Sequence, residues 1–234
     1  SSGEVKSRLC AMEFAWDLRN DTFAGTPPLT AVRMVLSWAA TVTRGEPRCL
    51  MVTDITCAFL HASMKGELPL YVVIPEGLGP PNSKGLLKAA LYGTRRASSL
   101  WGEKVAKVMT SDEGGFYRVK GCGQLYWYED AATKTLVVVL VVHGDDFFAD
   151  AEPGDMDWLD LVMDRSFLTR RFARVGPGAQ SEGRIMKRTL KWNTRGFELQ
   201  PDAKHHQAIL EMLGMENARG ADRPGTKTVG TGVR

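Results

Sequence analysis

The chain has 234 residues, a length that suits one large domain or two small ones and is ample for a buried core. Hydrophobic residues make up 44% and charged residues 24%, which excludes a disordered or collagen-like chain. The longest apolar run, residues 136–142, is far shorter than the roughly 18 residues that cross a bilayer, and the N-terminus has no signal-peptide pattern. The 4 cysteines form no Cys-x-x-Cys pair, which favours a reducing compartment over a disulfide framework or a zinc site.

Charge is distributed unevenly, although the formal net charge is only +3. Residues 111–160 contain eleven acidic and three basic side chains, whereas residues 165–195 contain nine basic side chains and one acidic. An acidic centre beside a basic segment suits a site that holds both cations and a polyanion. The alternative is that these charges only solvate helix faces, and composition alone leaves it open.

Hydrophobic periodicity and turn residues predict a mixture of helices and strands. In chain order we expect a helix at 30–42, strands at 50–55 and 70–74, a helix at 98–109, paired strands at 124–128 and 135–142, a helix at 158–167, a hairpin at 190–199 and a helix at 205–213. These elements do not alternate regularly as strand, helix, strand. The pattern therefore favours an α+β fold over a doubly wound parallel sheet.

The sharpest local feature is a β-branched run that leads directly into two adjacent carboxylates, Asp145 and Asp146, with a second apolar run after them. This pattern predicts a hairpin whose tip presents both acids, with Gly144 providing the conformational freedom of the turn. Two carboxylates at the end of a buried strand repel each other unless a cation or hydrogen-bond donors compensate. A solvated Asp-rich turn is the alternative interpretation.

A third acid, Asp54, interrupts the otherwise apolar strand predicted at 50–55. A lone buried aspartate is costly unless it is paired or coordinates a cation. If this strand lay beside the hairpin, three carboxylates would converge as ligands for two Mg²⁺ ions about 3.5–4 Å apart. Oxygen ligands without His or Cys nearby favour Mg²⁺ or Mn²⁺ over zinc, and phosphoryl or nucleotidyl transfer is the corresponding chemistry.

At this point the sequence resembles the reverse transcriptase domain of copia-type LTR retrotransposon Pol polyproteins. Residues 54–60 (DITCAFL) are similar to the family motif Asp-Val-Lys-Thr-Ala-Phe-Leu, and residues 143–146 stand where the family has Tyr-Val-Asp-Asp. Further segments resemble family motifs in the same order along the chain: 6–9, 22–36, 70–77 and 87–101. The departures include His143 in place of Tyr and Gly144 in place of Val or Met.

The resemblance implies a right-hand polymerase with fingers, a palm and a partial thumb. It assigns the fingers to residues 1–48 and 63–88, the palm to 49–62 and 89–162, and the start of a thumb, which we expect to be truncated, to 163–234. It also implies RNase H and integrase domains in the same polyprotein, whose motifs are absent here, no membrane partner, and a cytoplasmic retrotransposon particle as the place of action. The chain is then either a piece of a longer polyprotein or a stand-alone relic.

The resemblance also implies roles for individual residues. Asp54, Asp145 and Asp146 would hold two Mg²⁺ ions, for which Mn²⁺ could substitute, with Asp54 and Asp145 bridging them. The residues that would bind the incoming dNTP are Lys6, Arg8, Phe59, Tyr92 and Gly93, with Phe59 as the steric gate that excludes a 2′-hydroxyl. The residues that would bind the template and primer, whether RNA or DNA, are Arg95, Arg96, Arg170, Arg171, Lys187 and Arg188.

Three functions follow from these residues and remain open at this stage. The first is an RNA-directed DNA polymerase, a nucleotidyltransferase that extends a primer with dNTPs. The second is a degenerate relic that keeps the fold and binds nucleic acid without chemistry. The third, which needs no family resemblance, is a Mg²⁺-dependent phosphohydrolase that uses the same acids.

Overall fold

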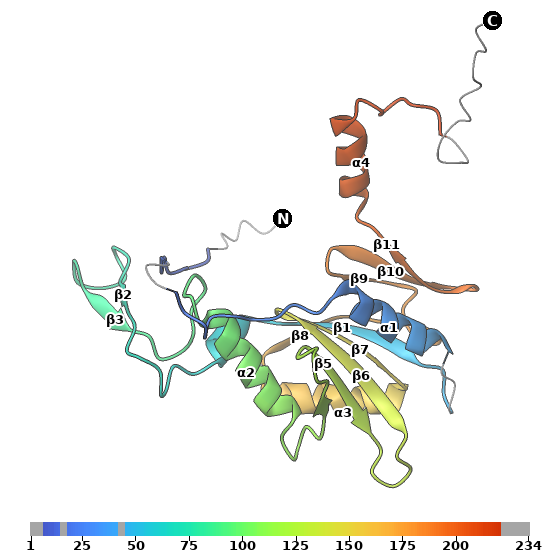
Figure 1. Cartoon of the computed structure of the whole chain (residues 1–234), viewed down its shortest axis with the longest axis horizontal. Coiled ribbons are helices and arrows are strands. Elements are labelled where there is room, and N and C mark those ends of the chain that lie inside the picture. Colours follow the sequence, from blue (N-terminus) through green and yellow to red (C-terminus); the bar gives the residue numbers. More distant parts are fainter. Residues whose placement is uncertain (1–6, 15–17, 42–44, 221–234) are drawn as a thin grey trace, which may run out of the picture. The chain divides into compact units, whose positions relative to one another are not determined.

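The computed structural model describes residues 7–14, 18–41 and 45–220 (Figure 1). The chain divides into two compact units, Ser1–Gln200 and Pro201–Arg234. The first unit contains the sheets, and we describe the second by itself. None of the helices in the described part of the chain is both long and apolar enough to span a bilayer.

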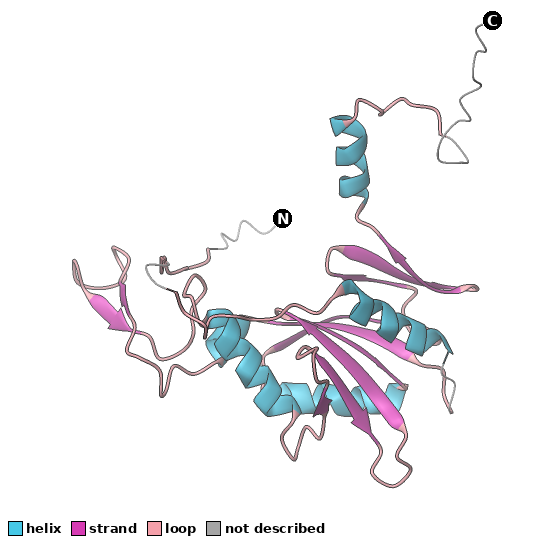
Figure 2. Cartoon of the chain, in the orientation of Figure 1, coloured by secondary structure: helices cyan, strands magenta, loops and turns pink. Residues whose placement is uncertain are grey.

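The centre of the first unit is a six-stranded sheet in which every neighbouring pair of strands is antiparallel (Figure 2). The strands in spatial order are β4 (Tyr117–Arg118), β5 (Leu125–Glu129), β6 (Leu136–His143), β7 (Asp146–Ala151), β1 (Cys49–Ile55) and β8 (Thr169–Val175). An antiparallel sheet combined with helices confirms the expected α+β class.

Helices cover both faces of this sheet. On one face, α2 (Ala97–Met109) and α3 (Pro153–Asp164) pack with Met51 and Ile55 of β1 in the larger hydrophobic cluster. On the other face, α1 (Leu29–Thr41) packs with Leu50 and Val52 of the same strand. Because alternate strand residues point to opposite faces, β1 is buried on both sides, and its apolar run reflects this.

Smaller elements surround the central sheet. They are the 3-10 helix η1 (Ala58–His61), the two-stranded sheet of β2 (Tyr71–Val73) and β3 (Lys84–Leu86), and the three-stranded sheet of β9 (Glu182–Ile185), β10 (Arg188–Asn193) and β11 (Gly196–Gln200). Leu190 of β10 is fully buried and joins the cluster of α1, so the three-stranded sheet packs on that side of the unit.

The second unit contains one helix, α4 (Ala203–Met212), within its described residues. Asp202 caps it by accepting a hydrogen bond from the backbone N–H of Lys204 at 3.0 Å. Gly214, with φ of +62°, follows the end of the helix, as the sequence predicts.

Most predicted elements are confirmed within one or two residues. One helix is displaced: α3 begins at Pro153, not at residue 158, because proline is favoured in the first helical turn. The strands β3, β4, β8 and β9 were not predicted. Of these, β8 matters most, because it belongs to the central sheet although it lies in the segment 163–234 that we assigned to a thumb.

Candidate active site

The two adjacent acids lie where the hairpin prediction puts them, at the turn between β6 and β7. His143 pairs with Asp146, so Gly144 and Asp145 form a two-residue turn. Gly144 has φ of +64°, whereas Asp145 is not among the residues with positive φ. This combination matches a type II′ turn, in which glycine is favoured at the first position. Asp145 is exposed at the tip, and Asp146 is half-buried at the start of β7.

The strand that carries Asp54 lies directly beside this hairpin. In the antiparallel register of β1 and β7, Asp54 is opposite Asp146. Next to it, the backbone N–H of Ile55 donates to the carbonyl oxygen of Asp145 at 2.9 Å, which ties the turn to β1. Side chains of directly opposed residues point to the same face. The strand of Asp54 is therefore adjacent to the hairpin, as the sequence predicts.

Two cationic or titratable residues flank the acids across the sheet. His143 of β6 is opposite Asp146, and Arg170 of β8 is opposite Asp54. The register thus gives a row across four strands, in the order His143, Asp146, Asp54 and Arg170. Sequence reasoning named Arg170 as a residue that would bind template and primer, not as a neighbour of Asp54, because that position depends on the pairing of β8 with β1.

The acids in this row are electrostatically unfavourable in the ionised state. Burial, and next the nearby Asp145 carboxylate, raise the pKa of Asp54, while Arg170 opposes this effect. Burial likewise raises the pKa of Asp146, followed by repulsion from Asp145 and Asp54, with His143 acting in the opposite direction. Repulsion among three carboxylates is the condition that a bound cation would relieve.

The arrangement of the acids decides whether they fit a metal ion. Among the residues that the structure describes, no group of three or more His, Cys, Asp or Glu is placed to hold a metal ion. This geometry still fits Mg²⁺, because Mg²⁺ is usually bound through one or two carboxylates plus substrate phosphates, not by an all-protein cage. The donors at hand, Asp54, Asp146 and Asp145, supply oxygen ligands only.

Three of the predicted nucleotide-binding residues contact one another beside the acids. The rings of Phe59 and Tyr92 lie with centroids 4.4 Å apart, and the guanidinium of Arg8 lies 5.0 Å from the Tyr92 ring centre. Burial and then the Asp145 carboxylate raise the pKa of Tyr92, so its hydroxyl stays protonated near the acids. Lys6, the fourth member of this predicted set, lies outside the described residues.

Gly93 permits a close approach of another backbone segment, and that segment is the one around Ala11. A Cβ at Gly93, which has φ of +85°, would collide with the carbonyl oxygen of Ala11. Two backbone hydrogen bonds accompany this approach, from Ala11 N to Tyr92 O at 2.7 Å and from Glu13 N to Gly93 O at 3.2 Å. In this structure the approach therefore serves folding of the segment around Ala11.

Arg95 and Arg96, predicted to hold phosphate, both contact carboxylates of the chain, Arg95 through its backbone N–H and Arg96 through its side chain. The backbone N–H of Arg95 donates to Glu13 at 2.8 Å. The side chain of Arg96 is paired with Glu67, with Asp21 at 3.4 Å and with Glu103 at 3.3 Å. Arg96 thus connects three segments of the chain, and this is a structural role.

The other four predicted basic residues divide between two surfaces. Arg171 pairs with Asp164 and, at 2.9 Å, with Asp160, both on α3. By contrast, Lys187 and Asp146 line one cavity of about 680 Å³ beside β9. Lys187 lies in the two-residue turn between β9 and β10, and Arg188 begins β10. Lys187 and Arg170 are therefore the predicted basic residues next to the acids.

Part of the charge asymmetry in the sequence is an internal network. Arg174 of β8 pairs with Asp157 and Asp160 of α3, each at 2.6 Å. Together with the pairs of Arg171, these bonds join the acidic centre to the basic segment on the α2 and α3 side of the sheet. Arg171 and Arg174 therefore have internal ion-pair partners, a role that differs from the solvation of helix faces considered from the sequence.

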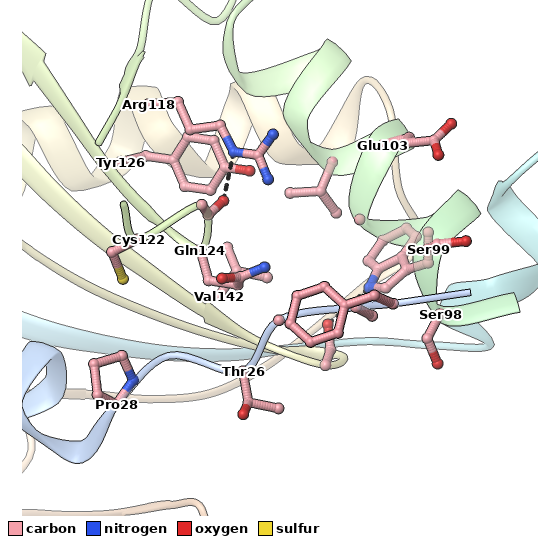
Figure 3. Close-up of a pocket in the computed structure, with 18 of the residues that line it drawn as sticks. Thr26, Pro28, Ser98, Ser99, Glu103, Arg118, Cys122, Gln124, Tyr126 and Val142 are labelled. Atoms are coloured by element: carbon pink, nitrogen blue, oxygen red, sulfur yellow. Dashed lines mark hydrogen bonds between the residues drawn. The ribbon is translucent and has the colours of Figure 1, made fainter. Parts of the chain in front are cut away.

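A second cavity lies behind the turn (Figure 3). It has a volume of about 650 Å³ and extends from Phe59 past Trp101 to Gly144. At its wall, Arg118 donates to the carbonyl oxygen of Gly123 at 2.6 Å and lies 6.0 Å from the ring centre of Tyr126. The indole Nε1 of Trp101 donates to the carbonyl oxygen of Gly144 at 2.7 Å, a contact that the sequence did not predict.

Comparison with known families identifies the class of protein. The family described as reverse transcriptase (RNA-dependent DNA polymerase) matches residues 2–176, which include Asp54, Asp145 and Asp146. The chain therefore belongs to the reverse transcriptase family, whose members are nucleotidyltransferases that act on a template and a primer. Neither the curated proteins nor the solved structures that were searched include a match.

Proposed function

We propose that the chain is the polymerase domain of a copia-type retrotransposon reverse transcriptase that extends a primer with dNTPs on an RNA or DNA template. The observation that carries this proposal is the opposition of Asp54 on β1 and Asp146 on β7, with Asp145 in the adjoining turn. The raised pKa of the first two acids supports it, because such a cluster is suited to a cation.

In the proposed reaction, the primer 3′-oxygen attacks the α-phosphorus of the dNTP. A new P–O bond forms, the bond to pyrophosphate breaks, and the 3′-hydroxyl proton leaves to solvent. Two Mg²⁺ ions, or Mn²⁺, would supply stabilisation of the attacking and leaving oxygens when bound. Asp54, Asp145 and Asp146 would hold them together with the triphosphate, and Arg170 would balance the charge of Asp54.

The contacting side chains of Phe59, Tyr92 and Arg8 would bind the nucleotide. Arg8 is exposed and would reach the triphosphate, while its guanidinium keeps its contact with the Tyr92 ring. Phe59 is half-buried and would lie under the sugar, where an aromatic ring clashes with a 2′-hydroxyl. Lys6 would join Arg8 by the same resemblance.

The cavity shared by Asp146 and Lys187 would receive the primer end of the duplex. Lys187, Arg188 and Arg170 would contact phosphates without reading the sequence, so binding would weaken as salt rises. A palm built on the six-stranded sheet, with fingers around β2 and β3, is the arrangement we propose. The RNase H and integrase domains and the cytoplasmic particle belong to the same proposal.

Primer extension tests this function. The chain is incubated with an RNA template, a DNA primer, dNTPs and Mg²⁺, and compared with the double variant Asp145→Asn/Asp146→Asn. Asp112→Asn/Glu113→Gln is the matched control, because it neutralises another adjacent acidic pair that is exposed. We expect extension by the wild type and the control only.

Other outcomes distinguish the alternatives. Salt-sensitive duplex binding without extension by any variant would identify a relic. Release of phosphate or cleavage of nucleic acid without dNTPs, lost in Asp145→Asn/Asp146→Asn, would identify a phosphohydrolase.

A further inference from the structure

The turn that carries Asp145 is attached to the rest of the first unit through two backbone carbonyls. The N–H of Ile55 donates to the carbonyl of Asp145, which is ordinary pairing at the end of β1. The indole N–H of Trp101 donates to the carbonyl of Gly144 at 2.7 Å. This second bond comes from the helix α2, and the pairing of the strands does not require it.

Trp101 is held rigidly enough to serve as an anchor. Its side chain is 3% exposed, and its ring meets Phe147 and Phe167 in edge-to-face contacts with centroid distances of 6.4 and 5.2 Å. Phe147 follows Asp146 directly on β7, so the same indole contacts both the turn and the strand after it. The indole N–H can only donate, and Gly144 is its acceptor.

Gly144 makes such an anchor necessary. A glycine with φ of +64° adopts this turn without strain, but it also contributes more backbone freedom than any other residue. A Cβ at Gly144 would have no atom within 4 Å, so side-chain packing does not hold this position. Beyond the closing pair of the hairpin, His143 and Asp146, the hydrogen bonds to its carbonyl and to that of Asp145 hold the turn against α2 and β1.

We propose that Trp101 is a positioning residue for the catalytic turn: its indole N–H fixes the peptide between Gly144 and Asp145 and so sets the place of the Asp145 carboxylate relative to Asp54. The effect on catalysis rests on the proposed function. The effect on the position of the turn does not, because it follows from the hydrogen bond and the packing alone.

Hydrogen exchange in Trp101→Phe tests the positioning directly. This variant keeps an aromatic ring and removes the donor. We expect the amide N–H of Ile55, which bonds to the turn, to exchange roughly tenfold faster, the ratio expected for loss of one hydrogen bond. The next amide, that of Thr56, bonds to Leu168 at 2.9 Å and should change less than about twofold.

Trp158→Phe is the matched control. Trp158 packs in the same hydrophobic cluster, against Phe116 and Tyr128 with centroid distances of 5.8 and 4.5 Å, away from the turn. It should leave the exchange of Ile55 unchanged relative to Thr56. Equal acceleration at Ile55 and Thr56 in Trp101→Phe, or no acceleration at Ile55, would overturn the proposal, because Trp101 would then only pack.

Metal binding and catalysis give a second readout. Mn²⁺ affinity, followed by the electron paramagnetic resonance of the free ion, should fall several-fold in Trp101→Phe, and the rate of extension should fall while KM for dNTP is unchanged. A wild type without extension contradicts the proposed function but leaves the exchange test decisive. If Trp101→Phe does not fold, exchange of the Trp101 indole N–H in the wild type decides, since exchange as fast as in a free indole refutes the bond.

Discussion

Breaking the buried ion pair of Arg48 and Asp150 should strongly destabilise the first unit. Arg48 directly precedes β1 and Asp150 lies in β7, so the pair joins the two strands that carry Asp54 and Asp146. Both paired side chains are 0% exposed. The Arg48 Nε lies 3.0 Å from each carboxylate oxygen of Asp150, and Nη2 donates to the carbonyl of Val137 at 2.7 Å.

Arg48→Met removes the positive charge while keeping much of the apolar stem. The buried Asp150 carboxylate then loses the arginine's charge, and breaking a buried pair in this way costs about 3–5 kcal/mol. Since 1 kcal/mol corresponds to about 2–4 °C in a domain of this size, we expect Tm to fall by about 6–20 °C. Replacing both residues, as Arg48→Met/Asp150→Leu, should recover most of the loss, because apolar replacements of a buried pair are often neutral.

Urea denaturation followed by tryptophan fluorescence measures these differences for the wild type, both single variants and the double variant. A loss below about 1 kcal/mol in Arg48→Met would mean that the pair contributes no more than an exposed ion pair does. If the double variant is no more stable than the less stable single variant, the unpaired buried charge does not account for the loss of stability.

Three further predictions concern the site. The raised pKa of Asp54 and Asp146 means that the folded chain keeps protons that the unfolded chain has released, so stability falls as pH rises above the ordinary value of 3.8. In the absence of divalent cations, Asp54→Asn or Asp146→Asn should therefore raise Tm at pH 7, and a gain that persists undiminished at pH 3 would refute this. Lys187 has φ of +61° in a two-residue turn and lies outside the hydrophobic clusters, so Lys187→Gly should stabilise the fold by about 1 kcal/mol in thermal unfolding. The same variant should reduce the salt slope of duplex binding by about 1, and an unchanged slope would remove Lys187 from the interface. Phe59→Ala should raise incorporation of ribonucleotides relative to dNTPs in a primer-extension competition, whereas an unchanged ratio would exclude a gating role.

The acidic turn and its partner strand could be predicted because each is encoded locally. The β-branched run before Gly144 and the single acid in the apolar strand of Asp54 are visible without tertiary information. Their adjacency also depended on the family resemblance, because strand order is not a local property. The pairing of β1 with β7 bears out that expectation.

The strand β8 was missed because its sequence, TRRFARV, reads as a basic segment. Arg171 and Arg174 are neutralised by Asp157, Asp160 and Asp164, which precede them in the chain. Asp157 and Asp160 belong to the stretch that we counted as an acidic centre, and Asp164 lies just after it. Counting charges along a sequence cannot separate such internal pairs from a binding surface. Buried and more exposed residues alternate only over residues 173–175, because the register against β1 shifts between Arg171 and Ala173, so the sequence offered little strand signal.

The roles of Trp101 and Gly93 could not be derived from the sequence. A tryptophan in an apolar helix face predicts core packing, and only the crossing of α2 beside the turn brings its indole N–H to Gly144. Likewise, the positive φ of Gly93 reflects the approach of Ala11, a contact between segments about eighty residues apart in the sequence.

The proposed catalytic site draws its acids from two places in the chain, β1 and the β6–β7 turn. Single-turnover extension of a primer on an RNA template with Mg²⁺ tests this assignment when Asp54→Asn and Asp146→Asn are compared with the control Asp112→Asn. Both site variants should abolish extension, although they lie on different strands, while the control should extend like the wild type. Extension at the wild-type rate by Asp54→Asn would mean that β1 contributes no catalytic group.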